Sequence, residues 1–319
     1  MSELFKVATV TLNPAIDQTI WIPNFQAGHV NRVQHIQTDA GGKGVNVASV
    51  LSDYGFQIAV TGFLGEENTP IFDRLFAWKK IDDRFVRIAG RTRVGIKIID
   101  EENTETTDIN YPGQAPTEAA IQRLFQIIEE LAVDYPWFVL AGSLPAGVSP
   151  DIYGDLISLI KSKGRAVALD TSGQALQQAL EVGPTLVKPN IDELQELVHY
   201  QLNTHQYVIQ AARQWLTRGI ETVVVSMGAE GAIFVEAEQL VLAAPPRVDV
   251  KSTVGAGDAM VSGTVAAKMQ GASLADCARL ATAFSLSAVT NVGAGLSSPE
   301  EVEAFKNQVS VRTLRSIND

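Results

Sequence analysis

The stretch VATVTLN, residues 7–13, is a short apolar run that ends in polar, turn-forming residues. Similar runs recur along the chain, at 58–65, 137–145, 166–173, 185–190 and 222–228. Segments with helical periodicity, such as IYGDLISLIKSKG and IDELQELVHY, separate most of these runs. Because buried parallel strands read as continuous apolar runs joined by crossover helices, the pattern predicts an α/β fold. Its central sheet should be mostly parallel and covered by helices on both faces.

Two stretches break this pattern, at about residues 15–39 and 90–112. In both, apolar residues alternate with polar or charged ones, which is typical of half-exposed antiparallel strands. Because such a small sheet cannot bury both faces alone, we expect it to pack as a lid over the main domain or against a second copy of itself. Residues 1–319 are therefore predicted to form a single domain with this discontinuous lid, and a homodimer through the lid is expected.

Composition excludes several functional classes. A net charge of -11 argues against a nucleic-acid partner, because binding a phosphate backbone requires clustered Lys and Arg. No stretch reaches the roughly 18 uninterrupted apolar residues of a membrane span, and the start MSELFKVATVTLNP lacks the pattern of a signal peptide. The single cysteine, Cys277, has no partner for an internal disulfide and lies on an expected buried helix face. We therefore expect a soluble protein without membrane contacts, in the reducing cytoplasm.

The stretch GGKGVNVASVL, residues 41–51, is a candidate binding loop. Gly41 and Gly42 allow backbone to approach a ligand closely, and Lys43 supplies a cation. A helix expected to begin near Val45 adds free N–H groups and a positive dipole end, so the loop is suited to an anion or a sugar. The alternative is a glycine-rich turn before a packed helix, although a turn does not require Lys43. The spacing does not match a phosphate-binding P-loop or a dinucleotide-binding fingerprint.

The stretch STVGAGDAMVSG, residues 252–263, combines small residues with one acid at the start of an expected helix. A helix that begins near Gly255–Gly257 directs its first N–H groups at a developing negative charge, while Asp258 accepts a proton from a hydroxyl. These are the two requirements of phosphoryl transfer, in which positioning and charge neutralisation account for most of the catalysis. The alternative is structural, with Asp258 only stabilising the helix N-terminus.

Taken in order, stretches spread over nearly the whole chain resemble the ribokinase-like phosphofructokinase B family of sugar kinases. They are TLNPAID (11–17), AGGKGVNVA (40–48), GRTR (90–93), TDIN (107–110), GSLPAGV (142–148), DTSG (170–173), VKPNIDEL (187–194), VSMGAEGA (225–232) and STVGAGDAMVSG (252–263). The resemblance implies a three-layer α/β sandwich with a small β-sheet lid, and ATP and Mg²⁺ as cofactors. It also implies a phosphosugar substrate and supports a homodimer.

The resemblance assigns roles to individual residues at the reacting end of the substrates. It implies that Asp258 is the catalytic base for the sugar hydroxyl. The backbone amides that would form the anion hole are those of Gly255, Ala256 and Gly257. The groups that would bind the sugar are Asp17, Gly41, Gly42 and Asn46. The cations that would hold the phosphate already on the sugar are Lys43 and Arg93, although simple surface solvation also explains an exposed cation.

Residues after the later strands are assigned to the nucleotide and its metal. The residues that would line the ATP site are Lys188, Asn190, Ser226, Gly228, Gly231 and Gly257. Asn190 and Glu193 correspond to the element that organises Mg²⁺, with Glu193 acting in part through water. Because Mg²⁺ keeps most of its waters, one carboxylate is chemically sufficient. A solvated helix face is the structural alternative for Glu193.

Within the family, TLNPAID, GRTR and TDIN are most similar to the 1-phosphofructokinase branch, which phosphorylates fructose 1-phosphate to fructose 1,6-bisphosphate with ATP. A tagatose-6-phosphate kinase or a 6-phosphofructokinase of the same family is the nearest alternative. A non-catalytic sugar-phosphate sensor is a third, but a pure binder has no need of the base Asp258. The family's pattern is incomplete at Ala146, where no charge is available for a phosphate.

Overall fold

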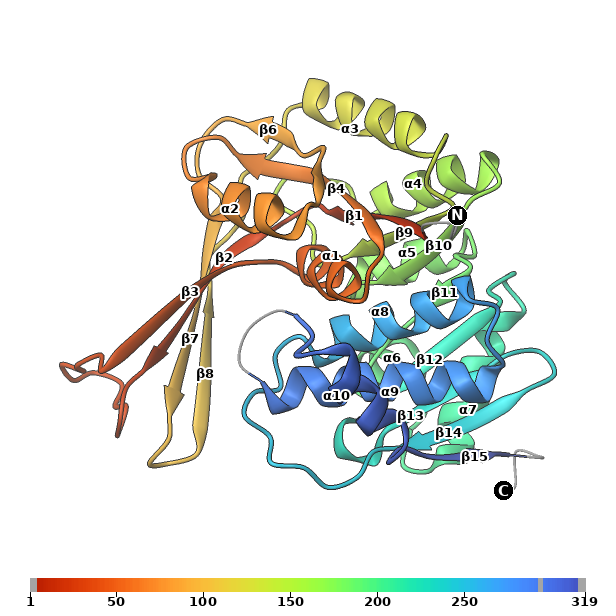
Figure 1. Cartoon of the computed structure of the whole chain (residues 1–319). Helices are drawn as coiled ribbons and strands as arrows, with labels where there is room; N and C mark the ends of the chain where they lie inside the picture. The colour runs from red at the N-terminus through yellow and green to blue at the C-terminus, as the bar shows by residue number, and fades with distance from the viewer. Residues whose placement is uncertain (1–4, 292–294, 315–319) are drawn as a thin grey trace.

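The computed structural model describes residues 5–291 and 295–314, and its core is a sheet of 11 strands between two layers of helices (Figure 1). These strands are Lys6–Thr11 (β1), Gln57–Gly65 (β4), Asp82–Asp83 (β5), Val86–Ile88 (β6), Trp137–Ala141 (β9), Ala166–Asp170 (β10), Leu186–Val187 (β11), Thr222–Ser226 (β12), Ala232–Val235 (β13), Leu240–Ala244 (β14) and Ser310–Thr313 (β15). Their order is β15-β14-β13-β12-β11-β10-β9-β1-β4-β5, with β6 also paired to β4.

Most of the central sheet is parallel, as the apolar runs predict. Each neighbouring pair from β5 to β12 is parallel, and β6 also pairs with β4 in the parallel sense. The remaining strands, β13, β14 and β15, continue the sheet in antiparallel pairs beyond β12. The predicted α/β class is thus confirmed, with an antiparallel edge in addition.

Helices bury both faces of this sheet. One face is covered by Lys43–Asp53 (α1), Pro70–Lys79 (α2), Ala256–Met269 (α8), Leu274–Thr290 (α9) and Pro299–Lys306 (α10). The other is covered by Glu118–Leu131 (α3), Ile152–Ser162 (α4), Gly173–Leu180 (α5), Ile191–Leu197 (α6) and His205–Leu216 (α7). Cys277 is buried in α9, as predicted. Among the described helices, none is long and apolar enough to cross a membrane.

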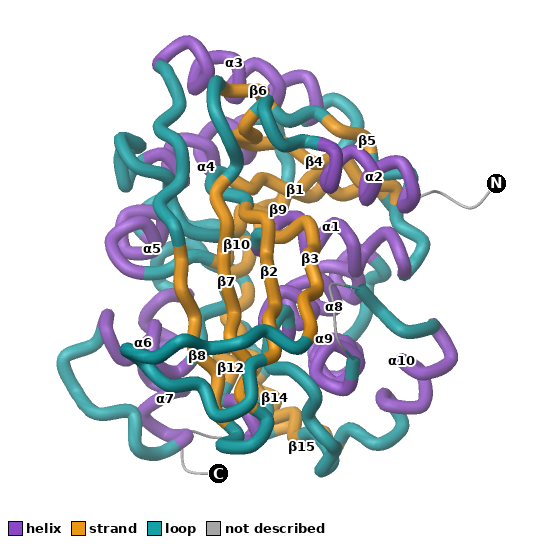
Figure 2. The backbone as a smooth tube through the Cα atoms, turned by 90° about the vertical axis from the view of Figure 1, so that its left-hand side faces the viewer, coloured by secondary structure: helices purple, strands orange, loops and turns teal. Residues whose placement is uncertain are grey.

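A second, four-stranded sheet projects from the body of the molecule (Figure 1). Its strands are Ala15–Trp21 (β2), His35–Gly41 (β3), Arg93–Asp100 (β7) and Glu105–Asn110 (β8), in the order β3-β2-β7-β8. The small second sheet predicted from the alternating stretches is therefore confirmed, and we call these four strands the lid. Figure 2, which faces the lid, shows its strands in front of the central sheet.

The lid differs from the expectation in one pairing. Its hairpins β2–β3 and β7–β8 are antiparallel, but β2 and β7 run parallel along seven paired positions, from Ala15 opposite Arg93 to Trp21 opposite Ile99. The reason is topological: β2 follows β1 and β7 follows the β4–β6 region, and β1 and β4 are parallel neighbours. Both excursions therefore leave the body in the same direction.

Candidate active site

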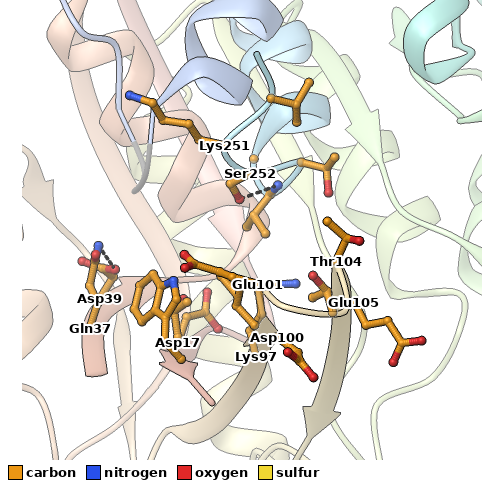
Figure 3. Close-up of a pocket in the computed structure, with 18 of the residues that line it drawn as sticks. Asp17, Gln37, Asp39, Lys97, Asp100, Glu101, Thr104, Glu105, Lys251 and Ser252 are labelled. Carbon is orange, nitrogen blue, oxygen red and sulfur yellow. Dashed lines mark hydrogen bonds between the residues drawn. The ribbon is translucent and has the colours of Figure 1, made fainter. Parts of the chain in front are cut away.

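A cavity of about 770 Å³ lies between the lid and the segment that precedes α8 (Figure 3). Its lid wall carries the side chains of Asp17, Asp39 and Lys97, and the facing wall is formed by residues 250–255. Asn46 from α1 also lines the space. Its volume is within the range of small-molecule sites, roughly 300–1,000 Å³. The cavity thus brings Asp17 close to the STVGAGD stretch. More than half of the chain separates the two in the sequence.

Asp17 in β2 points into this cavity from a crowded position (Figure 3). A Cβ atom on Gly41 would lie 1.9 Å from Asp17 Oδ2, so only glycine at residue 41 leaves room for the carboxylate. Burial raises the pKa of Asp17 to about 6, with a smaller contribution from Asp39, while the Arg93 charge opposes the rise. Asp17 is thus a hydrogen-bond acceptor that is ionised near neutral pH.

Asp258 lies buried in the first turn of α8. Asn46 Nδ2 donates a hydrogen bond of 2.8 Å to Asp258 Oδ2 and fixes the orientation of the carboxylate. The N-cap residue Gly255 has a left-handed φ of 78°, and no described side chain caps the helix. The amides of Ala256 and Gly257, in the first turn, therefore have no intrahelical acceptor. A buried carboxylate and free backbone donors occupy one helix start, as the sequence predicts for phosphoryl transfer.

Asp170, at the end of β10, is a functional candidate that the sequence analysis did not select. Its side chain is 1% exposed, and its Oδ1 lies 3.0 Å from Lys43 Nζ and 3.6 Å from Lys188 Nζ. Burial alone would raise the pKa of Asp170, but the two ammonium groups hold it below its ordinary value. Lys188 Nζ in turn lies 3.4 Å from the place a Cβ on Gly257 would take. Asp170 therefore holds two cations beside the start of α8.

The charge on Asp170 also acts on Asp258. Burial is the main cause that raises the pKa of Asp258 to about 6, and the neighbouring Asp170 carboxylate adds to the rise. Lys43, Lys188 and the hydrogen bond from Asn46 work in the opposite direction. Two nearby carboxyl groups whose environments push their pKa values apart are a common sign of divided acid–base roles. Asp170 stays ionised and holds the lysines, while Asp258 exchanges a proton near neutral pH.

The structure separates the two cations expected at the substrate's phosphate. Lys43 is the first residue of α1, which begins two residues earlier than expected, and its Nζ lies 4.0 Å from Glu193 as well as beside Asp170. Arg93 begins β7 on the lid. Burial lowers the pKa of Arg93, and the negative charge of Asp17 opposes this shift. Lys43 therefore lies with the groups at the ends of β10 and β11 instead of with Arg93.

Asn190 and Glu193 form the N-terminal cap of α6. Asn190 Oδ1 accepts a 2.7 Å hydrogen bond from the Glu193 N–H, and Glu193 Oε2 accepts a 2.8 Å hydrogen bond from the Asn190 N–H. This capping box uses the side-chain oxygen of Asn190. Glu193 Oε1 remains beside Lys43, at 4.0 Å. A single carboxylate oxygen next to a lysine that suits phosphate fits Mg²⁺ carried by a nucleotide, because Mg²⁺ takes its other ligands from phosphates and water.

Ser226, Gly228 and Gly231 lie around the end of β12. Ser226 pairs with Asn190 in an isolated parallel bridge, which places it beside the capping box. A Cβ on Gly228 would meet open space, which is consistent with an approaching ligand. Gly231 is glycine for a different reason, because a Cβ there would lie 2.0 Å from the carbonyl oxygen of Ala243. Tight packing of β13 against β14 explains this residue without a nucleotide.

A profile of the pfkB family carbohydrate kinases matches residues 8–301. The chain belongs to this family. The 1-phosphofructokinase of Rhodobacter capsulatus is 46% identical over 310 residues, which cover 97% of this chain and 98% of the relative. The 1-phosphofructokinase of Vibrio cholerae is 42% identical over 309 residues, 97% of either chain. The predicted family is therefore confirmed.

Solved structures of pfkB-type phosphofructokinases share the fold. Phosphofructokinase-2 from Escherichia coli in complex with substrates and products has a TM-score of 0.89 at 30% identity, covering 95% of this chain and 98% of that one. The tetrameric inhibited form of the same protein has a TM-score of 0.87 at 29% identity, covering 95% and 99%. As a pfkB carbohydrate kinase, the chain is a sugar phosphotransferase with ATP as its phosphoryl donor. The roles of single residues stay predictions.

Replacing Asp258 with Asn should stabilise the protein at neutral and alkaline pH. The pKa of Asp258 rises on folding from 3.8 to about 6, so the folded state binds the proton more tightly than the unfolded state. The wild type therefore gains stability as the pH falls through 6 toward 4, and the Asn variant lacks this gain. Calorimetry should show a Tm advantage of Asp258→Asn that is largest above pH 7 and shrinks below pH 6.

The control for this measurement is Glu196→Gln, an exposed carboxylate on α6. Its Tm difference from the wild type shows what the loss of an exposed carboxylate does over the same pH range. A difference for Asp258→Asn that does not change with pH would contradict the raised pKa.

Proposed function

We propose that the protein phosphorylates D-fructose 1-phosphate to fructose 1,6-bisphosphate with ATP. The observation that carries the reaction type is the buried Asp258 carboxylate at the uncapped start of α8, beside two lysines held by Asp170. Support for the substrate comes from relatives named 1-phosphofructokinase at 46% and 42% identity over nearly the full length of both chains. GRTR and TDIN, which lie in the lid region, support the same choice.

In the proposed mechanism, Asp258 takes the proton from the hydroxyl at the end of the sugar opposite its phosphate. The sugar oxygen then attacks the γ-phosphorus in line, the bond from this phosphorus to the β–γ bridging oxygen breaks, and ADP leaves. The amides of Gly255, Ala256 and Gly257 stabilise the charge on the transferred group. Lys43 and Lys188, which Asp170 holds beside the start of α8, would be the counter-cations of the transferred phosphoryl group.

The remaining residues bind the two substrates. Asp17, Gly41, Gly42 and Asn46 hold the sugar hydroxyls, and Arg93 binds the phosphate that the sugar already carries. The position of Lys43 favours the transferred phosphate over this one. Ser226, Gly228 and Asn190 line the nucleotide. Glu193 would hold Mg²⁺, directly or through water, and the ion would neutralise charge on the ATP phosphates when bound.

A substrate panel tests the proposed function. ADP release would be measured with ATP, Mg²⁺ and one of fructose 1-phosphate, fructose 6-phosphate, tagatose 6-phosphate or unphosphorylated fructose. We expect the highest kcat/KM on fructose 1-phosphate. A preference for a 6-phosphate would overturn the substrate, whereas tight phosphosugar binding without any turnover would replace the kinase by a sensor.

The Asp258→Asn variant tests the base. Because the amide cannot take a proton, kcat should fall by about 10²- to 10⁴-fold, the usual effect of a general base. The Kd for fructose 1-phosphate, measured by calorimetry, should stay near the wild-type value, since the amide oxygen can still accept the hydrogen bond from Asn46. Unchanged turnover would remove Asp258 from the mechanism, and Glu196→Gln serves again as the control.

We also propose a single domain with a discontinuous lid, and a location in the cytoplasm. The continuous 11-stranded sheet supports a single domain, because strands from both ends of the chain belong to it. The location rests on the single cysteine, Cys277, which has no cysteine partner for a disulfide.

We propose further that the lid forms a homodimer. Its face opposite Asp17 carries apolar pairs: Ile20 lies opposite Ile36, and Ile96 lies opposite Ile109. Ile36 is 52% exposed and Ile109 is 43% exposed. An open sheet with an exposed apolar face is a preferred site of association, and a second lid offers the complementary surface. A tetrameric form among the related structures supports self-association in this family.

Charged substitutions on this face should disrupt the dimer. Ile36→Lys and Ile109→Lys place an ammonium group in the proposed interface, and each should raise the dimer dissociation constant by about 10-fold or more. Sedimentation measures the change. Val133→Lys, at a residue 72% exposed and remote from the lid strands, should leave the oligomeric state as it is. A monomeric wild type, or dimers that persist in both lid variants, would refute the proposal.

A further inference from the structure

A second, small pocket adjoins the base of the lid and contains two arginines. Its lining includes Arg91, Arg93, Asn13 and Gln114. Arg93 was selected from the sequence as a phosphate-binding residue, but Arg91 was not. We infer that Arg91 is a second phosphate-binding side chain, which acts with Arg93 on the phosphate that the sugar already carries. This inference rests on the proposed function.

The backbone between the two arginines is fixed to the body of the protein. Thr92, between the two arginines, is 6% exposed. Asn68 Oδ1 accepts a 2.8 Å hydrogen bond from the Thr92 N–H, and Asn68 Nδ2 donates a 2.9 Å hydrogen bond to the Thr92 carbonyl. Thr92 Oγ1 also accepts a 3.0 Å hydrogen bond from the Gly65 N–H. Thr92 is thus fixed to the body, and Arg91 and Arg93, on either side of it, both line the pocket.

The pocket is next to the sugar site. Arg93 lies opposite Ala15 in the lid register, two residues before Asp17, and its charge acts on the Asp17 carboxylate. Asp17 and Asn46 line the large cavity, and Asn46 bonds to Asp258. A phosphosugar with its phosphate at the arginines thus has its hydroxyls at Asp17 and its other end toward Asp258. The small pocket has room for about one water-sized group, so the phosphate occupies its mouth.

The charge on Arg91 is available for a ligand. Nearby Arg84 and Arg87 form ion pairs with carboxylates. Arg91 is exposed, and it makes no hydrogen bond or ion pair with any residue in the part of the chain that the structure describes. In a protein with a net charge of -11, a guanidinium left without a carboxylate can present its full set of donors to a phosphate. Arg91 and Arg93 together supply two positive charges, which match the two negative charges of a sugar phosphate.

Binding measurements on Arg91→Ala test this inference. The Kd and KM for fructose 1-phosphate should rise by about 10- to 100-fold, the effect of losing a charge-assisted hydrogen bond. The kcat value and the KM for ATP should remain near wild type, because the contact is equally strong before and during the reaction. Unphosphorylated fructose, used as a competitive inhibitor of fructose 1-phosphate, should keep its inhibition constant. If Arg91 had a merely structural role, the inhibition constant of fructose would rise to the same extent.

Two further variants complete the design. Arg91→Lys keeps the charge without the guanidinium fork and should recover part of the affinity. Arg87→Ala removes a neighbouring guanidinium that is paired with Asp83, and should leave the Kd unchanged. An unaltered Kd in Arg91→Ala would overturn the inference, as would an equal loss in Arg87→Ala. If Arg91→Ala failed to fold, the same Kd comparison would be made between Arg91→Lys and the wild type, and an unaltered Kd there would overturn it.

The measurements distinguish a failure of this inference from a failure of the proposed function. If the wild type preferred a 6-phosphate, the substrate would be wrong, and Arg91→Ala would be measured on that phosphosugar. A loss of affinity there would still support a phosphate contact from Arg91. If the wild type turned over fructose 1-phosphate and Arg91→Ala bound it equally well, only the inference about Arg91 would fail.

Discussion

The buried negative charge of Asp170 is the interaction on which the rest of the site depends. The carboxylate lies between the ammonium groups of Lys43 and Lys188 and positions both lysine side chains. A buried ammonium group without a carboxylate is strongly destabilising, so removing Asp170 would leave the buried Lys188 without the carboxylate that faces it. The same charge helps to raise the pKa of Asp258. One carboxylate thus both holds two cations together and helps to raise the pKa of its neighbour.

The parallel topology brings these groups together. Asp170 ends β10 and Lys188 directly follows β11, which are adjacent strands, so their carboxyl ends meet at one edge of the sheet. α1 and α8 begin at the same edge, and they supply Lys43 and Asp258. Ligands of open α/β sheets bind at this edge because the loops that follow the strands gather there. The lid is inserted after β1 and after the β4–β6 region, so it is tied to the body at the same place.

Much of this could be predicted from sequence, because apolar runs and the GAGD turn are local signals. Asp17, Asn46 and Gly255 were selected separately, and the structure brings all three to one cavity. The direction of Lys43 could not be predicted, since it depends on Asp170, 127 residues away. The antiparallel edge β13–β15 was also not predicted, because short strands in hairpins give weak periodicity. Gly231 shows a further limit of the sequence. A glycine there indicates that another group lies close to the backbone, but not whether this group is a ligand or, as here, the carbonyl of Ala243.

In the proposed mechanism, recognition and chemistry are separated in space, because the two sets of residues are anchored on different sheets. The chemical groups are held by Asp170 at the edge of the central sheet, whereas Asp17 and Arg93 belong to the lid. Alternation along the lid strands places Asp17 on one face and the isoleucine pairs on the other. The turn at 90–93 is fixed to the body by hydrogen bonds that Thr92 makes with Asn68 and Gly65. Substitutions that flank Thr92 should therefore leave the geometry of the cluster around Asp170 unchanged.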